Sequence, residues 1–262
     1  MIPIGERING MFTDVKRAIL EKDASAVHDL ARRQTDAGAK FLDCNVGTAA
    51  SDREAAMRWL VTEIQNAVDT PIAVDSQNFD VVKAGVEVCD SPVMINSVSG
   101  DPDKLTTYIT YALEKEASLL ALTMDRRGVP QDVNTRLEIA ATVVTTAMEM
   151  GLAMEKLYID PIIIPVNVAQ DQPTKLLDVI QQVRMLADPA PHIAIGLSNI
   201  SQGTGQRSLI NRIFLVMAAG AGLDSAIVDV LDTELMDAWI TAEMLLDKQI
   251  YSDSFLKAGR MT

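Results

Sequence analysis

Polar side chains recur at the ends of short apolar stretches along this chain. Asp75, Asn96 and Asp160 stand in this position, and Ser198 and Asn199 end a later stretch. A carboxylate can accept two parallel hydrogen bonds from a planar pair of N–H groups, and an amide can both donate and accept. If the stretches are parallel strands, these side chains converge on one pocket that binds and polarises a small ligand.

A single Asp or Asn after a strand can simply cap the next helix. Polar residues at several strand ends are harder to explain in this way, and they therefore favour a common site. Gln202 and Arg207 add polar groups from one loop. Inward-facing carboxylates repel one another and lose solvation, so a ligand rich in hydrogen-bond donors is their natural partner. Both a binding role and a structural role stay open for further strand-end residues, namely Glu6, Arg7, Asp43 and Asn45.

The side chains of this predicted site disfavour several kinds of catalysis. Cys44 lies within a strand, no Ser or Cys neighbours a His, and no Lys ends a strand, which argues against a covalent nucleophile or a Schiff base. Two Cys and two His lack metal-ligand spacing, so we expect no metal, although acidic ligands assembled in three dimensions stay open. The remaining chemistry is one in which bound molecules supply both reacting groups.

Eight short apolar runs alternate with amphipathic segments, which predicts repeated βα units. Near-continuous hydrophobicity suits strands buried on both faces, and a barrel of eight such units takes about 250 residues. We therefore expect a single-domain (β/α)8 TIM barrel over residues 1–262; an open doubly wound sheet is the alternative, but no phosphate-binding glycine pattern follows the first run. The predicted strands are 2–7, 41–46, 72–76, 93–97, 119–124, 157–160, 193–198 and 226–229. The predicted helices include 52–67, 101–117, 133–150, 173–187, 209–221 and 233–246.

Composition restricts the partners and the location of the protein. A net charge of −13 repels a phosphate backbone, so we expect no nucleic-acid partner. No apolar run reaches the roughly 18 residues of a membrane-spanning helix, and the first residues lack a secretory signal. The two cysteines lie in apolar surroundings, which fits a reducing compartment. We expect a cytoplasmic protein without a membrane partner.

Several strand ends also carry motifs of a known family. The motifs are GERING from Gly5, VDS around Asp75, INS around Asn96, YIDP around Asp160 and GLSNISQ around Asn199. With them the chain resembles the pterin-binding methyltransferases over essentially its whole length. It is most similar to the methyltetrahydrofolate:corrinoid/iron–sulfur-protein methyltransferases. More distantly it resembles dihydropteroate synthase and the folate domain of cobalamin-dependent methionine synthase.

The resemblance implies a barrel, usually a homodimer, that binds tetrahydrofolate or methyltetrahydrofolate in its mouth. It implies that Asp75, Asn96 and Asp160 contact the pterin and that Asn199 lies close to N5, as the catalytic residue. Between residues 202 and 207 the chain reads GTGQ, where the family carries bulkier residues, so the corrinoid contacts of this loop stay open. The resemblance further assigns substrate binding to Gly196, Ser198, Gln202 and Arg207.

The reaction that the resemblance implies is transfer of a methyl group between pterin N5 and the cobalt of a corrinoid. The chain has no cobalamin-binding motif of its own, so a cobalamin would come from a partner protein or from solution. The transition state is shared by both directions, so the direction, the partner and the pathway stay open between acetyl-group synthesis and demethylation. A dihydropteroate synthase-like enzyme and a non-catalytic folate-binding subunit are the alternatives.

Overall fold

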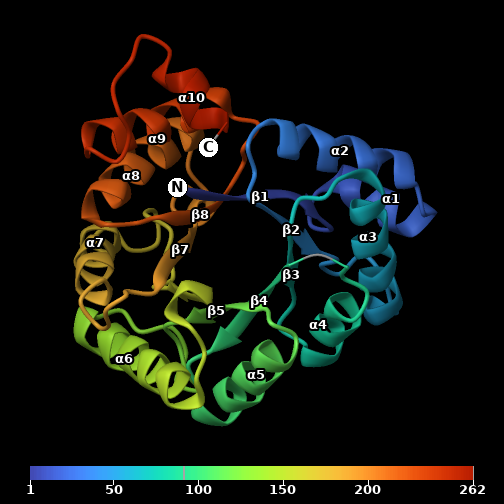
Figure 1. The fold of residues 1–262 in the computed structure, drawn as a ribbon, viewed down its shortest axis with the longest axis horizontal. Helices are drawn as coiled ribbons and strands as arrows, with labels where there is room; N and C mark the ends of the chain where they lie inside the picture. The colour runs from blue at the N-terminus through green and yellow to red at the C-terminus, as the bar shows by residue number, and fades with distance from the viewer. Residues whose placement is uncertain (91, 262) are drawn as a thin grey trace.

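Eight parallel strands close into a barrel in the computed structural model, which describes residues 1–90 and 92–261 (Figure 1). Each strand pairs with the next one along the chain, and β8 pairs with β1. This confirms the predicted (β/α)8 barrel. The strands are β1 (Ile2–Asn9), β2 (Phe41–Asn45), β3 (Ile72–Asp75), β4 (Val93–Ser99), β5 (Ser118–Leu122), β6 (Leu157–Asp160), β7 (His192–Gly196) and β8 (Ser225–Val228).

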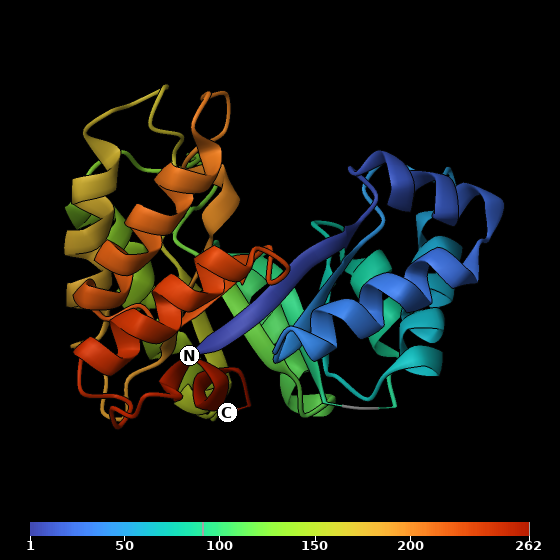
Figure 2. The same ribbon diagram turned by 90° about the horizontal axis from the view of Figure 1, so that it is seen from above.

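Helices surround the strands on the outside of the barrel, and the two termini lie close together at one end (Figures 1 and 2). Asp52, Asp132 and Asp232 cap three of the helices by accepting a hydrogen bond from a backbone N–H in the first turn. No helix in the described ranges is long and apolar enough to cross a membrane. The helices are α1 (Thr13–Glu21), α2 (Ala24–Asp36), α3 (Arg53–Ala67), α4 (Phe79–Val86), α5 (Pro102–Glu114), α6 (Val133–Met150), α7 (Gln172–Val183), α8 (Arg207–Ala221), α9 (Thr233–Leu245) and α10 (Phe255–Met261), with 3-10 helices η1 (Met154–Lys156) and η2 (Leu197–Asn199).

The end of the seventh strand differs from the prediction, which extended it through residue 198. The strand ends at Gly196, and Ser198 and Asn199 belong to η2. Pairing with β8 also stops at Gly196, so the chain is free to turn there. Ser198 and Asn199 therefore lie on a short helical turn at the barrel end.

Two strands are interrupted where they approach the barrel end. The register of β1 against β2 shifts between Gly5 and Ile8, and that of β4 against β5 shifts between Asn96 and Val98. Such bulges redirect side chains and are common beside active sites. They also explain why both strands run two residues beyond their predicted ends, because pairing resumes after the shift.

The interior of the barrel changes from apolar to polar along the strand direction. One buried layer consists of Ile4, Ala73, Met94, Leu120, Tyr158 and Ala194. Because side chains alternate along a strand, the residue two positions later points to the same side. Those residues include Glu6, Asp75, Asn96 and Asp160. The polar residues of the predicted site therefore stand directly above an apolar plug.

A test of the outer layer compares two helical glycines. A Cβ at Gly85 in α4 would lie 2.7 Å from Val74 Cγ1 and 2.9 Å from Met57 Cγ, whereas one at Gly220 in α8 meets nothing within 4 Å. We expect Gly85→Ala to lower the free energy of unfolding by about 1–3 kcal/mol through overpacking. Gly220→Ala should raise it by roughly 0.5–1 kcal/mol through helix propensity. Urea denaturation measures both, and equal effects would contradict the close contact at Gly85.

Candidate functional site

A cavity of about 630 Å³ opens at the carboxyl ends of the strands. This is the face on which barrel enzymes carry their active sites. Of the residues predicted from the sequence, its lining includes Glu6, Arg7, Asp43, Asp75, Gly196, Ser198, Asn199 and Arg207. We call this cavity, together with Asn96 and Asp160 of the same polar layer, the mouth.

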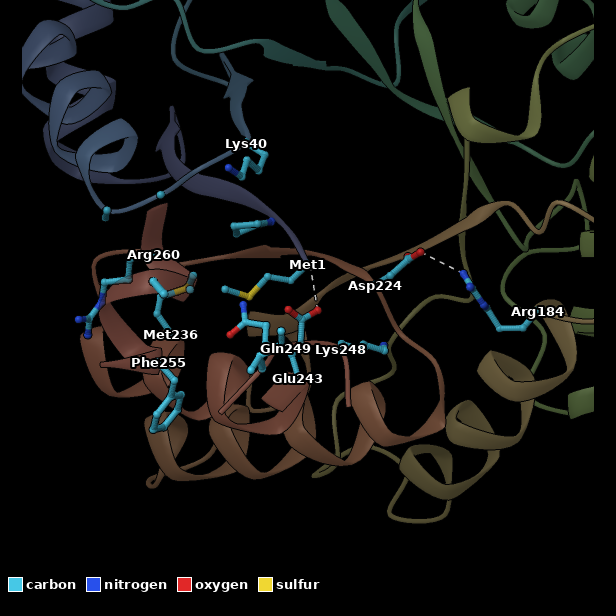
Figure 3. A pocket seen from close by; sticks show the side chains of 16 residues that line it. Met1, Lys40, Arg184, Asp224, Met236, Glu243, Lys248, Gln249, Phe255 and Arg260 are labelled. Carbon is cyan, nitrogen blue, oxygen red and sulfur yellow. Dashed lines mark hydrogen bonds and ion pairs between the residues drawn. The ribbon is translucent and has the colours of Figure 1, made fainter. Parts of the chain in front are cut away.

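A second cavity, of about 660 Å³, lies at the opposite end of the barrel, beside the termini (Figure 3). Its charged groups are largely used within the fold. The amino group of Met1 pairs with Glu243 at 2.9 Å, and Arg184 pairs with Asp224 at 3.0 Å. Active sites of barrel enzymes lie at the carboxyl ends of the strands, so we place the functional site at the mouth.

Asp75 at the end of β3 is held by its neighbour on β2. Asn45 Nδ2 donates to Asp75 Oδ2 at 2.6 Å, and Asn45 Oδ1 accepts from the backbone N–H of Gly47 at 2.6 Å. Burial raises the pKa of Asp75 to about 6, although the hydrogen bond from Asn45 lowers it. Asn45, whose role the sequence left open, orients Asp75 and leaves its other carboxylate oxygen for a ligand.

Asn96, where the register of β4 shifts, is held in the same way by Asp43. Its Nδ2 donates to Asp43 Oδ1 at 2.9 Å, and the two side chains belong to residues that are 5% and 2% exposed. Burial and the nearby Asp75 raise the pKa of Asp43 well above its ordinary range. Asp43 is thus a supporting group, and Asn96 keeps its carbonyl oxygen and one N–H for a ligand.

Asp160 ends β6 on the other side of the mouth. Its Oδ1 accepts a 2.7 Å hydrogen bond from the backbone N–H of Ile162, a β-branched residue with a left-handed φ of 61°. That conformation is costly for such a residue. Burial raises the pKa of Asp160 to about 7.

Glu6 and Arg207 fix the turn that carries Ser198. Ser198 Oγ lies 2.8 and 2.9 Å from the two carboxylate oxygens of Glu6. Arg207 Nη2 donates to the carbonyl oxygen of Ser198 at 3.0 Å, and its Nε donates to Ser201 Oγ at 3.2 Å. Burial raises the pKa of Glu6. Arg207 therefore tethers η2 to the start of α8, and Glu6 supports Ser198.

Asn199 is exposed, and its side-chain amide makes no hydrogen bond with a described residue. It lies against Gly196, where an added Cβ would come within 2.9 Å of Asn199 Nδ2. Any side chain at position 196 would therefore displace the amide. Gln202 is exposed on the following turn and does not line the cavity, so the structure does not bring it to the other predicted residues.

The cavity has polar lining residues that the sequence prediction did not select. Asn211 lies one helical turn after Arg207, and its Oδ1 is buried without a hydrogen-bond partner among the described groups. Sequence features could have identified three of these residues: Asp229 follows a strand, Asp232 caps a helix, and Asn211 lies four residues after Arg207 in one helix. Arg7, by contrast, pairs with Asp14 at 2.8 Å and lies over the ring of Phe12. The polar lining residues that the sequence prediction missed are Asn9, Ser208, Asn211, Asp229 and Asp232.

The buried acids predict a dependence of stability on pH. Because the folded-state pKa of Asp160 is raised to about 7, ionising it costs stability as the pH rises toward and through 7. We expect Asp160→Asn to raise the free energy of unfolding at pH 8 by about 1–3 kcal/mol, with a smaller gain at pH 5. Urea denaturation at both pH values measures this.

Asp224→Asn is the control with the opposite sign. Burial alone would raise the pKa of Asp224, but its hydrogen bonds with His192 and Ile193 and the charge of Arg184 hold the pKa below its ordinary value. Its replacement should therefore lower stability at pH 8. A loss of stability at pH 8 in Asp160→Asn as well would contradict the proposed cost of the Asp160 charge.

Comparisons with known proteins identify the family of this chain. The sequence pattern of the family described as "Pterin binding enzyme" matches residues 11–229. A methylcorrinoid:tetrahydrofolate methyltransferase of Eubacterium limosum is 32% identical over 262 residues, which cover 99% of this chain and 96% of that protein. Methionine synthase of Mycobacterium leprae (strain TN) is 30% identical over 241 residues, covering 87% of this chain and 20% of that protein.

Solved structures support the fold. Dihydropteroate synthase of Yersinia pestis superposes with a TM-score of 0.67 at 16% identity, covering 94% of each chain. At this identity the likeness shows the barrel alone. The family pattern spans most of the chain, and a relative above 30% identity aligns with nearly all of it, so this chain belongs to the pterin-binding enzymes.

Proposed function

We propose that residues 1–262 form one methyltransferase barrel that transfers a methyl group between N5 of tetrahydrofolate and the cobalt of a corrinoid. The observation that carries this proposal is the polar layer of the mouth, in which Asp75, Asn96 and Asp160 lie above an apolar plug and are each held by a hydrogen bond. Similarity over nearly the whole chain to a methylcorrinoid:tetrahydrofolate methyltransferase supports it and favours transfer from the methylated corrinoid to tetrahydrofolate.

The proposed binding of the pterin follows from its hydrogen-bonding edge. The 2-amino-pyrimidinone part of a pterin offers neighbouring N–H donors beside an acceptor. Asp75 and Asp160 keep acceptor oxygens after their contacts within the protein, and Asn96 keeps a carbonyl oxygen and an N–H. Binding donors to buried carboxylates also relieves the desolvation that raises their pKa.

Asn199 is the proposed catalytic residue. When a methyl group leaves methyltetrahydrofolate, nitrogen N5 is a poor leaving group. It gains electron density as its bond to the methyl carbon breaks. An amide does not titrate near neutral pH, but it can donate a hydrogen bond to that nitrogen, while the proton itself comes from water. The Asn199 amide is exposed at the mouth without a partner in the described chain, which leaves it free for this contact.

The remaining proposed binding residues shape the wall beside Asn199. Gly196 lets the Asn199 amide approach the backbone, and Ser198 and Arg207 hold the turn in place. Gln202 is exposed on the same turn, so we assign it to the side that faces an incoming corrinoid. The neighbouring Gly203 has a left-handed φ of 77°, a conformation suited to glycine.

The alternatives explain the mouth less well. A dihydropteroate synthase-like reaction releases pyrophosphate and needs basic side chains, whereas the cavity is lined by five carboxylates and two arginines, namely Glu6, Asp43, Asp75, Asp229, Asp232, Arg7 and Arg207. The two arginines already bind Asp14 and the η2 turn. A non-catalytic folate-binding subunit would have no use for the free amide of Asn199.

The corrinoid is a substrate that we assign to a partner protein or to free cobalamin. The mouth is open to solvent on the side of Asn199, so the cobalt would approach from outside the barrel. We place the reaction in the cytoplasm, which agrees with two free cysteines. The net charge of −13 argues against nucleic acid as a partner, and we assign no membrane partner.

We also propose that the enzyme is a homodimer. The outer face of α8 exposes large apolar side chains at Leu209, Ile213 and Met217, which are 54%, 54% and 45% exposed. Their spacing of four residues puts them on one face of the helix. Contiguous exposed apolar surface of this kind marks an interaction site.

The proposed reaction has a direct spectroscopic test. Purified protein should convert methylcobalamin and tetrahydrofolate to cob(I)alamin and methyltetrahydrofolate, or catalyse the reverse reaction, as followed by the cobalamin absorbance. Asn199→Ala should slow transfer by about 10²–10³-fold, the usual loss when a hydrogen bond to developing charge is removed. Asp75→Asn should chiefly weaken folate binding. No spectral change with the unmodified protein in either direction would refute the proposal, and undiminished turnover in Asn199→Ala would remove Asn199 from the mechanism.

The dimer is tested by charging its proposed interface. Ile213→Glu places a carboxylate at the centre of the apolar stripe, so it should convert the dimer to a monomer in analytical ultracentrifugation. Lys16→Glu, at an exposed position of α1, is the matched surface control and should leave the mass unchanged. A monomeric unmodified protein, or a dimeric Ile213→Glu variant, would contradict this assignment.

A further inference from the structure

Arg136 in α6 is a buried charge whose role the proposed reaction does not explain. The residue is 0% exposed, and none of the ion pairs of the described chain includes its guanidinium. Burying a charge without an ion-pair partner is costly, and arginine is seldom fully buried in that state. Other interactions of Arg136 must therefore offset the cost of burying its charge.

The hydrogen bonds of Arg136 join two segments that border the mouth. Its Nε donates to the carbonyl oxygen of Pro130 at 2.9 Å, and its Nη2 donates to Gln172 Oε1 at 2.9 Å. Gln172 Nε2 in turn donates to the carbonyl oxygen of Gln131 at 2.9 Å. Pro130 and Gln131 lie in the loop after β5, and Gln172 begins α7 after the loop that follows Asp160. The guanidinium thus ties the loop after β5 to the first residue of α7.

One donor of this guanidinium is left over. Arg136 Nη1 is buried and has no hydrogen-bond partner among the described residues. Two carboxylates act on the charge of Arg136, those of Asp160 and Asp132, and Arg136 is the charged side chain that acts on Asp160. Asp132 is already used as the cap of α6, where it accepts from Thr135. Asp160 is therefore the mouth residue on which the buried charge acts.

We propose that Arg136 is a positioning residue for the pterin: it holds the loop after β5 to the start of α7 and supplies a positive charge that favours the ionised, hydrogen-bond-accepting form of Asp160. The inference rests on the proposed function, because it acts through the assigned contact between Asp160 and the pterin. A planar guanidinium suits this role, since it remains charged when buried and offers donors in fixed directions. Neutral glutamine and carbonyl partners bind it without cancelling its charge.

The test measures the dissociation constant of tetrahydrofolate between pH 5.5 and 9 by anaerobic calorimetry. Binding to the unmodified protein should weaken as the pH falls through about 7 and again through about 6, because protonation of Asp160 and then of Asp75 removes acceptors for the pterin N–H groups; the midpoint near 7 reports Asp160. Arg136→Met should move this midpoint upward by about one pH unit, since loss of a nearby positive charge raises the pKa of a carboxyl group. Arg136→Lys should keep the midpoint and weaken binding at every pH. Lysine keeps the positive charge, but it lacks the planar set of N–H donors that bonds Pro130 and Gln172.

Arg126→Met is the matched control. Arg126 lies on the loop after β5, which also contains Pro130, and it is exposed and pairs with Asp101 at 3.1 Å. It should leave both the midpoint and the affinity unchanged. Uniformly weaker binding by Arg136→Met with an unshifted midpoint would reduce Arg136 to a structural residue and overturn the proposal. Failure of the unmodified protein to bind tetrahydrofolate at any pH would instead refute the proposed function.

A double-mutant cycle keeps the proposal testable if Arg136→Met does not fold. Arg136→Gln, which removes the charge but keeps an amide donor, should weaken tetrahydrofolate binding at pH 7 by about fivefold in the unmodified background, within the range of coupled residues. In the Asp160→Asn background the same change should weaken it by less than about twofold, because the acceptor through which Arg136 acts is gone. Equal losses in the two backgrounds would show that Arg136 does not act through Asp160.

Discussion

The mouth of this barrel depends on carboxylates that the fold removes from water. Closure of eight strands brings Asp43 and Asp75 close enough to raise each other's cost of ionisation, and burial raises the pKa of both. An apolar layer beneath them leaves them no solvent on that side. The hydrogen bonds that Asn96 and Asn45 donate to Asp43 and Asp75 lower the free-energy cost of ionising these carboxyl groups but do not remove it. A planar ligand with several N–H groups would satisfy these carboxylates, which is the physical argument for the proposed pterin contacts.

Four of the proposed contacts with the ligand are each backed by a second polar group. Asn45 supports Asp75, Asp43 supports Asn96, Glu6 supports Ser198, and the N–H of Ile162 supports Asp160. This arrangement fixes which atoms remain free, because each supporting bond uses one donor or acceptor of the contacting residue. The Asn199 side chain has no such support among the described residues, and it stands on a tethered turn at the solvent edge. Rigid anchors and one free amide suit a site that holds the folate and leaves N5 open to a second substrate.

The barrel by itself does not identify the chemistry. Dihydropteroate synthase shares it at 16% identity, and barrels support many reactions through different loops. The assignment depends on the side chains at the strand ends and on similarity that extends over nearly the whole chain. Outside the mouth, the opposite end is closed by pairs such as Met1 with Glu243, which hold the termini to the barrel. Stability and binding thus occupy opposite ends of the same strands.

The sequence by itself determined the barrel and most of the mouth. Apolar runs of strand length are local signals, and alternation along each strand puts Asp75, Asn96 and Asp160 on one side without any knowledge of their neighbours. Only the tertiary structure decided that Asp43 and Asn45 are supporting groups, that Gln202 lies outside the cavity, and that Arg136 acts beside the mouth. These are relations between residues about 30 to 50 positions apart, and the distances between such side chains depend on strand register, bulges and loop paths that no local pattern encodes.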